Sequence, residues 1–140
     1  MSDAKQLFVV VGPRGVVNVA YVIEKMDKWL SIVGEDAMLV VTDQGRGINP
    51  AVRAWAESAG VEVQEVQLNW RPDANGKATN MAAAYEFNDT CLTQADGLIA
   101  FVGEPGKDPA IKNAVETAGA LGIKSFVVPP CPVQAVAVTL

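Results

Sequence analysis

The 140-residue sequence predicts an α/β protein with a three-layer, Rossmann-like fold, built on a mostly parallel sheet of five strands or slightly more. Short runs of apolar, strand-forming residues alternate with longer segments in which apolar residues recur at helical spacing. This alternation begins and ends on a strand, which is typical of a parallel sheet with helical crossovers. In addition, glycine-bearing loops follow the first four predicted strands, where ligands bind in such sheets.

The first half of the chain alternates regularly. Residues 7–11 are a short apolar run ended by Gly-Pro, which is typical of a buried parallel strand, and residues 37–42 form a second such run. A helix that ends at Gly34 is predicted between them. Its apolar positions at helical spacing are Val19, Val22, Ile23, Met26, Leu30 and Val33.

The second helix and the third strand are marked by their ends. The helix is predicted to begin at or near Asn49, because Pro50 suits a first turn, and to end at Gly60. Residues 61–66 alternate between apolar and polar, so this strand is expected near the sheet edge. Residues 67–77, rich in Pro, Asp, Asn and Gly, are predicted to form a long loop.

The remaining elements continue the same order. A third helix is predicted over residues 78–93, although Asn88 is a poor helix former there. Gly122 is predicted to cap the fourth helix. The fourth strand, the fourth helix and the fifth strand are predicted at residues 98–102, 110–121 and 125–128.

One domain of residues 1–140 is expected, because a chain of this length can bury a substantial core. Residues 129–140 are predicted to be an apolar C-terminal tail. Its last part, residues 133–140 (VQAVAVTL), can add a strand, cover a neighbouring subunit or fray. The valines favour the first two, since a frayed end would expose them.

The composition of the chain argues against membrane, histidine-dependent and metal-dependent functions. With 19% charged residues and no leader-like start, the chain is predicted to be an ordered, cytoplasmic protein with no membrane partner. The sequence has no histidine, which excludes a histidine base or ligand. Cys91 and Cys131 lack the spacing of metal ligands, so neither a metal site nor a cofactor is predicted.

The four glycine-bearing loops favour a small anionic ligand. Loops 12–17, 43–50, 67–77 and 103–109 carry five of the 11 basic residues and four of the 16 acidic ones, so they are less acidic than the rest of the chain. Glycines and helix starts at such an edge favour phosphate. The overall net charge of −5 argues against a nucleic-acid partner. The alternative is that these loops are simply polar and solvated.

Two common nucleotide motifs are absent. A P-loop would need a glycine at Arg71 and a serine or threonine at Ala78 around Gly76-Lys77. A dinucleotide fingerprint would need a glycine at Arg14, so an NAD-dependent dehydrogenase is not expected.

Six weak motifs in the right order instead resemble the SLOG superfamily, and within it the YspA-related branch. The similarity covers roughly residues 7–128. The motifs are Gly12-Pro13-Arg14; Gly45-Arg46-Gly47-Ile48-Asn49 with Trp55-Ala56; Asn69-Trp70; Gly76-Lys77-Ala78; Phe87-Asn88; and Asp96-Gly97-Leu98-Ile99-Ala100-Phe101.

This resemblance implies a Rossmann-like fold that binds nucleotides or molecules derived from them, and it favours a homo-oligomer, as does the apolar tail. The more distant Lonely-Guy-type enzymes are nucleoside monophosphate phosphoribohydrolases with a threonine for phosphate and a glutamate at the ribose. The matching turn here keeps Gly103 and Gly106 but has Lys107 and Ala110 at those two positions. The resemblance therefore implies phosphate binding more than hydrolysis.

The basic and glycine residues of the first two loops are candidates for phosphate contacts. Arg14 can hold phosphate bidentately at the start of the first helix, or can pair with a neighbouring acid. Gly45, Arg46 and Gly47 can ring a second anionic group with backbone amides, or form a plain loop-to-helix turn.

The later loops supply candidates for the base, the sugar and any chemistry. Trp70 can stack on a base or plug the core, and Lys77 can reach phosphate or remain solvated. Lys107 can bind a highly charged ligand, or its side chain can fill the site of a missing phosphate. Asp43 can accept hydrogen bonds from ribose, and Glu104 can act as an acid or base, although capping is the commoner role of such carboxylates.

The sequence thus predicts a protein that binds a nucleotide or an ADP-ribose-like phosphate ligand at the C-terminal edge of the sheet, as a sensor or binding protein rather than an enzyme. The alternatives are a nucleotide N-glycosidic bond hydrolase, for which Asp43 and Glu104 are weak catalytic candidates, and an assembly protein without a ligand. The predicted ligand-binding residues are Gly12, Pro13, Arg14, Gly15, Asp43, Gly45, Arg46, Gly47, Trp70, Lys77, Gly103, Glu104, Gly106 and Lys107.

Overall fold

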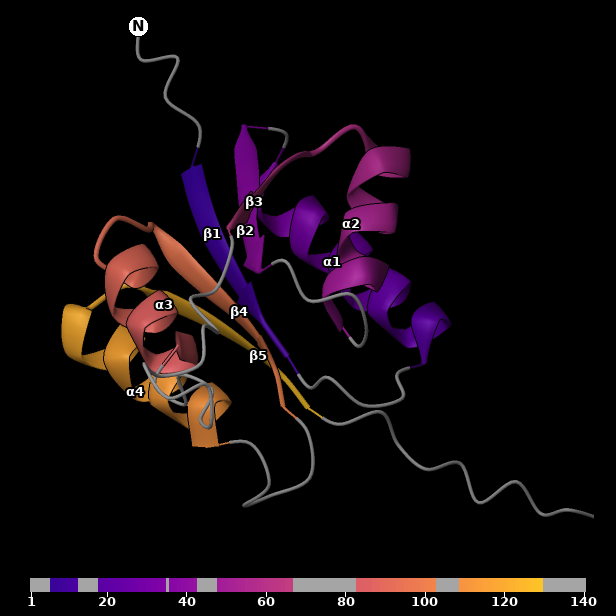
Figure 1. The fold of residues 1–140 in the computed structure, drawn as a ribbon. Helices are drawn as coiled ribbons and strands as arrows, with labels where there is room; N and C mark the ends of the chain where they lie inside the picture. The colour runs from indigo at the N-terminus through magenta and orange to yellow at the C-terminus, as the bar shows by residue number, and fades with distance from the viewer. Residues whose placement is uncertain are drawn as a thin grey trace, which may run out of the picture.

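The computed structural model describes residues 6–12, 18–34, 36–42, 48–66, 83–102 and 109–129. In this part of the chain, four helices flank a five-stranded parallel sheet, which confirms the predicted fold class (Figure 1). The strands are β1 (Gln6–Val11), β2 (Ala37–Thr42), β3 (Glu62–Val66), β4 (Gly97–Phe101) and β5 (Lys124–Val128). The helices are α1 (Val19–Val33), α2 (Ile48–Ala59), α3 (Ala83–Leu92) and α4 (Pro109–Leu121).

The strand order is β3-β2-β1-β4-β5, so the first strand lies in the centre of the sheet. Phe8 is in register with Leu39 of β2 on one side and with Gly97 of β4 on the other. β3 lies at one edge, as its alternating sequence predicts, and its side chains are exposed or half-buried. Every residue of β4 is buried, because this strand is covered on both faces.

Alternate residues of each central strand enter two separate hydrophobic cores. Phe8 and Val10 of β1 pack with α1 and α2, whereas Val9 packs with α3 and α4. Figure 1 shows the same division, with α1 and α2 on one side of the sheet and α3 and α4 on the other. This alternation explains why the central strands carry apolar residues at consecutive positions.

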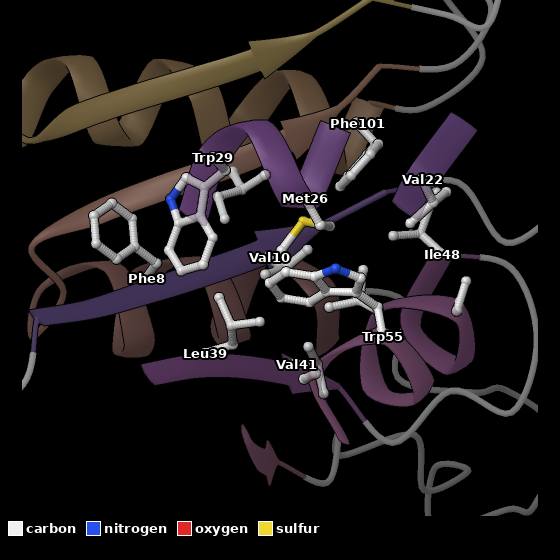
Figure 2. Close-up of a cluster of buried hydrophobic side chains, with 14 of the residues drawn as sticks. Phe8, Val10, Val22, Met26, Trp29, Leu39, Val41, Ile48, Trp55 and Phe101 are labelled. Carbon is white, nitrogen blue, oxygen red and sulfur yellow. The ribbon is translucent and has the colours of Figure 1, made fainter. Parts of the chain in front are cut away.

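Aromatic side chains fill the core between the sheet and the pair α1 and α2 (Figure 2). The Trp29 ring lies edge-on to Phe8 at a centroid distance of 5.1 Å and to Trp55 at 6.2 Å. The Trp55 indole nitrogen donates to Oδ1 of Asp27 at 2.8 Å. Both tryptophans are nearly fully buried and act as packing groups, since burying an aromatic or large aliphatic side chain contributes about 1.5–3 kcal/mol.

The helix ends follow local chemistry. Asn18 caps α1 through its side chain, which accepts from the Tyr21 amide at 3.1 Å. Gly34 and Gly122 follow the ends of α1 and α4 with φ angles of 84° and 73°, a conformation that favours glycine.

The third helix, predicted over residues 78–93, ends one residue earlier than predicted. Within the described residues it covers Ala83–Leu92, and residues 78–82 lie outside them. Thr93 belongs to the following turn, where its hydroxyl donates to the Asp89 carbonyl at 2.6 Å. The predicted tail lies outside the described residues from residue 130 onward.

Candidate functional site

The carboxyl ends of all five strands lie on one edge of the sheet, because every strand pair is parallel. The chain moves from β1 outward to β2 and β3, then crosses back to place β4 on the other side of β1. The loops that follow β1 and β4 therefore depart to opposite faces of the sheet from adjacent strands. Such a switch point is where open α/β sheets bind ligands. We call the region around Gly12 and Val102 the switch edge.

Gly12 directly follows β1 and lies against the start of α2. A Cβ atom built on Gly12 would fall 2.7 Å from Cβ and 2.9 Å from Cγ2 of Ile48. Real side chains do not approach so closely, so a glycine is required here for the packing of α2 on β1. This contact holds the end of β1 against the start of α2 at the switch edge.

Three helices begin at this edge without a carboxylate in their first turn. They are α1, α2 and α4, and none has an acidic residue there. The tyrosine hydroxyl of Tyr21, in the first turn of α1, donates to the Pro129 carbonyl at 2.5 Å, which places that turn beside the end of β5. The amino end of a helix carries a partial positive charge, so this arrangement is favourable for an anion.

A buried asparagine fixes the start of α4. Asn88 of α3 is 2% exposed, and its amide nitrogen donates to the Ala110 carbonyl at 2.9 Å and to Oδ1 of Asn113 at 3.1 Å. These bonds tie the two helices on that face of the sheet together at the point where α4 begins. The sequence signal for this role was a poor helix former in the middle of a predicted helix, and it was not recognised as such.

The floor of the switch edge is apolar. Val22 of α1, Ile48 of α2 and Phe101 of β4 are buried in one cluster, and Figure 2 shows them together at the end toward which the strands run. Val102 continues from Phe101, and its amide donates to the Val128 carbonyl at 2.9 Å. The core directly beneath this edge is therefore apolar and closely packed.

Of the predicted ligand-binding residues, Gly12 lies in the described part of the chain and stands at the switch edge. The others are outside the described residues: Pro13, Arg14, Gly15, Asp43, Gly45, Arg46, Gly47, Trp70, Lys77, Gly103, Glu104, Gly106 and Lys107. Their roles stay predictions. The close approach of Gly12 to Ile48 gives this glycine a packing role that the sequence did not reveal.

Two grooves with described linings lie beside α1, and each extends to residues at the carboxyl edge of the sheet. One, of about 350 Å³, lies between α1 and α2 and includes Ile23, Ala54 and Trp55. The other, of about 320 Å³, lies between α1 and β5 and includes Trp29 and Phe126.

The other described residues provide neither a metal site nor an activated nucleophile. Among residues 6–12, 18–34, 36–42, 48–66, 83–102 and 109–129, no group of three acidic or cysteine side chains is placed to hold a metal ion. Burial raises the pKa of the Cys91 thiol above its ordinary value of 9.0, which disfavours the nucleophilic thiolate. None of the described helices has the length and apolar character needed to cross a membrane.

Comparison of the sequence with protein-family models and with curated proteins finds no match, so the resemblance to the SLOG superfamily stays a prediction.

Proposed function

We propose that this chain binds a nucleotide or a nucleotide-derived, ADP-ribose-like phosphate ligand at the switch edge, and that it acts as a binding or sensor protein. The observation that carries this proposal is the convergence of three helix starts, free of first-turn carboxylates, on the carboxyl edge of a parallel sheet. Partial positive charge at the helix starts favours phosphate without any catalytic group.

The sequence of the adjoining segments supports the same ligand class. Arg14 lies in the segment between Gly12 and α1, and Lys107 lies in the segment between Val102 and α4. Both segments leave from the adjacent strands β1 and β4. A guanidinium and an ammonium in these segments suit the oxygens of a mono- or diphosphate group.

Thermal unfolding in the presence of inorganic phosphate, AMP, ADP, ADP-ribose and NAD tests the proposal. A ligand at one hundred times its Kd stabilises the folded state by about 2.7 kcal/mol, which raises Tm by roughly 9 °C for a chain of this size. Stabilisation by nucleotides beyond that given by inorganic phosphate supports the proposal. A Tm unchanged by every phosphate compound contradicts it.

Charge variants locate the site. Arg14→Lys keeps the charge but removes the bidentate contact, and Lys107→Ala removes a charge; each is expected to weaken binding about tenfold or more. The matched control is Lys124→Ala, because Lys124 begins β5 at the opposite edge of the sheet and is exposed. Equal affinity losses in Lys107→Ala and Lys124→Ala would place the ligand elsewhere.

The same nucleotide mixtures distinguish binding from hydrolysis. Chromatography after incubation with AMP is expected to return the nucleotide intact. Release of free adenine, lost in Glu104→Gln, would instead identify a hydrolase.

A further inference from the structure

The groove between α1 and β5 has an apolar lining with basic residues beside it. Its volume is about 320 Å³. Trp29 and Ile32 of α1 line one side, Phe126 and Val128 of β5 line the other, and Lys25 and Lys28 of α1 also contribute. We call it the β5 groove.

Apolar surface remains exposed around the β5 groove in the described part of the chain. Ile32 is 61% exposed and Val127 is 51% exposed. Within the described sheet β5 pairs with β4 alone, so β5 is an edge strand. Exposed apolar side chains beside an edge strand are a liability that proteins usually cover.

Trp29, which lines this groove, also carries a buried donor. Trp29 is 3% exposed, and its indole N–H has no hydrogen-bond acceptor among the described residues. Leaving such a group unsatisfied costs about 1–3 kcal/mol, so an acceptor is expected beside it. A backbone carbonyl of a chain segment seated in the groove is a suitable acceptor.

The chain itself delivers a suitable segment to this place. The groove reaches Pro129, where the described part of the chain ends, and the Tyr21 hydroxyl holds the Pro129 carbonyl against α1. Pro129, Pro130 and Pro132 then favour a turn. In residues 133–140 the bulky Val136 and Val138 alternate with small side chains, which is the pattern of an extended segment with one apolar face.

The lengths agree. Eight extended residues span about 26 Å, whereas the five residues of β5 span about 17 Å, so residues 133–140 can run the full length of β5 after a four-residue turn. Their far end then reaches Ile32, near the C-terminal end of α1.

We propose that residues 133–140 of the same chain lie extended and antiparallel to β5 in the β5 groove, with Val136 and Val138 facing α1 and a backbone carbonyl accepting the Trp29 indole N–H. The segment covers the edge strand and satisfies the buried donor. This inference is independent of any ligand at the switch edge.

A matched pair of variants in the full chain tests the inference. Val138→Asp puts a charge on the face turned into the groove, whereas Ala137→Asp puts the same charge on the opposite face. Val138→Asp is expected to lower Tm by about 3–6 °C and Ala137→Asp by less than about 1 °C. Hydrogen exchange of the Trp29 indole N–H, followed by NMR, is expected to accelerate at least tenfold in Val138→Asp alone.

Milder variants cover the case in which Val138→Asp does not fold. Ile32→Ala and Val138→Ala are expected to lower Tm non-additively, because the two side chains share a contact in the docked state. Strict additivity, together with unchanged indole exchange in Val138→Ala, overturns the inference.

The mass in solution separates docking on the same chain from docking on a second copy. The expected result is that indole exchange and Tm do not depend on protein concentration, and that Val138→Ala leaves the mass unchanged. Concentration-dependent protection, with a smaller assembly in Val138→Ala, would assign the groove to a neighbouring copy and overturn the proposal.

Discussion

Replacing Gly12 by alanine tests the packing at the switch edge. The backbone of Gly12 has no positive φ, so alanine is allowed there and the effect is steric. Its Cβ would lie 2.7 Å from Cβ of Ile48, against about 3.5–4.0 Å for a relaxed carbon contact, so the start of α2 must move by about 1 Å.

Forcing a methyl group into a packed core costs about 1–3 kcal/mol. Ile48 is 3% exposed and packs beneath α1 and β4, so it has little room to yield. We therefore expect Gly12→Ala to reduce the free energy of unfolding by about 2 kcal/mol, which lowers Tm by roughly 7 °C. Urea unfolding followed by circular dichroism measures this difference.

The chain offers a matched glycine as control. Gly119 lies inside α4, and a Cβ built there would meet no atom within 4 Å. Gly119→Ala is expected to raise stability by about 0.5–1 kcal/mol, because alanine is the better helix former. The same chemical change thus has opposite signs at the two positions.

A double-mutant cycle assigns the cost to Ile48. Ile48→Ala removes Cγ1 and Cγ2 but keeps Cβ, so it relieves part of the clash. The loss in Gly12→Ala with Ile48→Ala is expected to be smaller than the sum of the single losses by about 1 kcal/mol. A neutral Gly12→Ala, or an additive cycle, would refute the proposed contact between β1 and α2.

Three further outcomes follow from hydrogen bonds and burial. Asn88→Ala is expected to destabilise the fold by about 2–3 kcal/mol in urea and to speed amide exchange in the first turn of α4, because the Ala110 carbonyl loses the donor that the buried Asn88 supplies. Unchanged amide exchange there would contradict this positioning role. Asp27→Ala is expected to cost about 1 kcal/mol, since the Trp55 indole loses its acceptor, and a neutral result in denaturant would show that water replaces it. Burial raises the pKa of the Cys91 thiol, so the folded state holds the thiol proton more tightly than the unfolded state. The free energy of unfolding relative to Cys91→Ser is therefore expected to be constant below about pH 9 and to fall as pH rises through the folded pKa. A free-energy difference between the two proteins that stays constant up to about pH 10.5 would contradict this burial effect.

Most of the fold could be predicted from the sequence, because the spacing of apolar residues and the glycines that end helices are signals contained within each element's own sequence. The apolar run around Val9 is readable as a strand buried on both faces, and the apolar positions between Val19 and Gly34 define one helix face. The weakest prediction was the third helix, because Asn88 has poor helix propensity. Its buried hydrogen bonds to α4 offset that propensity, and such tertiary contacts cannot be read from local sequence.

The sequence predicted where the candidate site lies in the fold but not the arrangement of its side chains. Parallel topology brings Gly12 and Val102 to one edge, and that much follows from the order of elements. The side-chain geometry of a loop depends on long-range contacts that periodicity does not encode. Even at Gly12, the sequence predicted backbone access for a ligand, whereas the structure shows a close approach to Ile48.

The central position of β1 affects the order in which the sheet assembles during synthesis. Phe8 meets Leu39 thirty-one residues later but meets Gly97 only after eighty-nine, and the Leu7 amide is held by the Asp96 carboxylate across the same distance in sequence. During synthesis, β1, β2 and β3 can associate before β4 has left the ribosome, whereas one wall of the switch edge awaits the last third of the chain. The switch edge is consequently assembled only after β4 has joined the sheet beside β1.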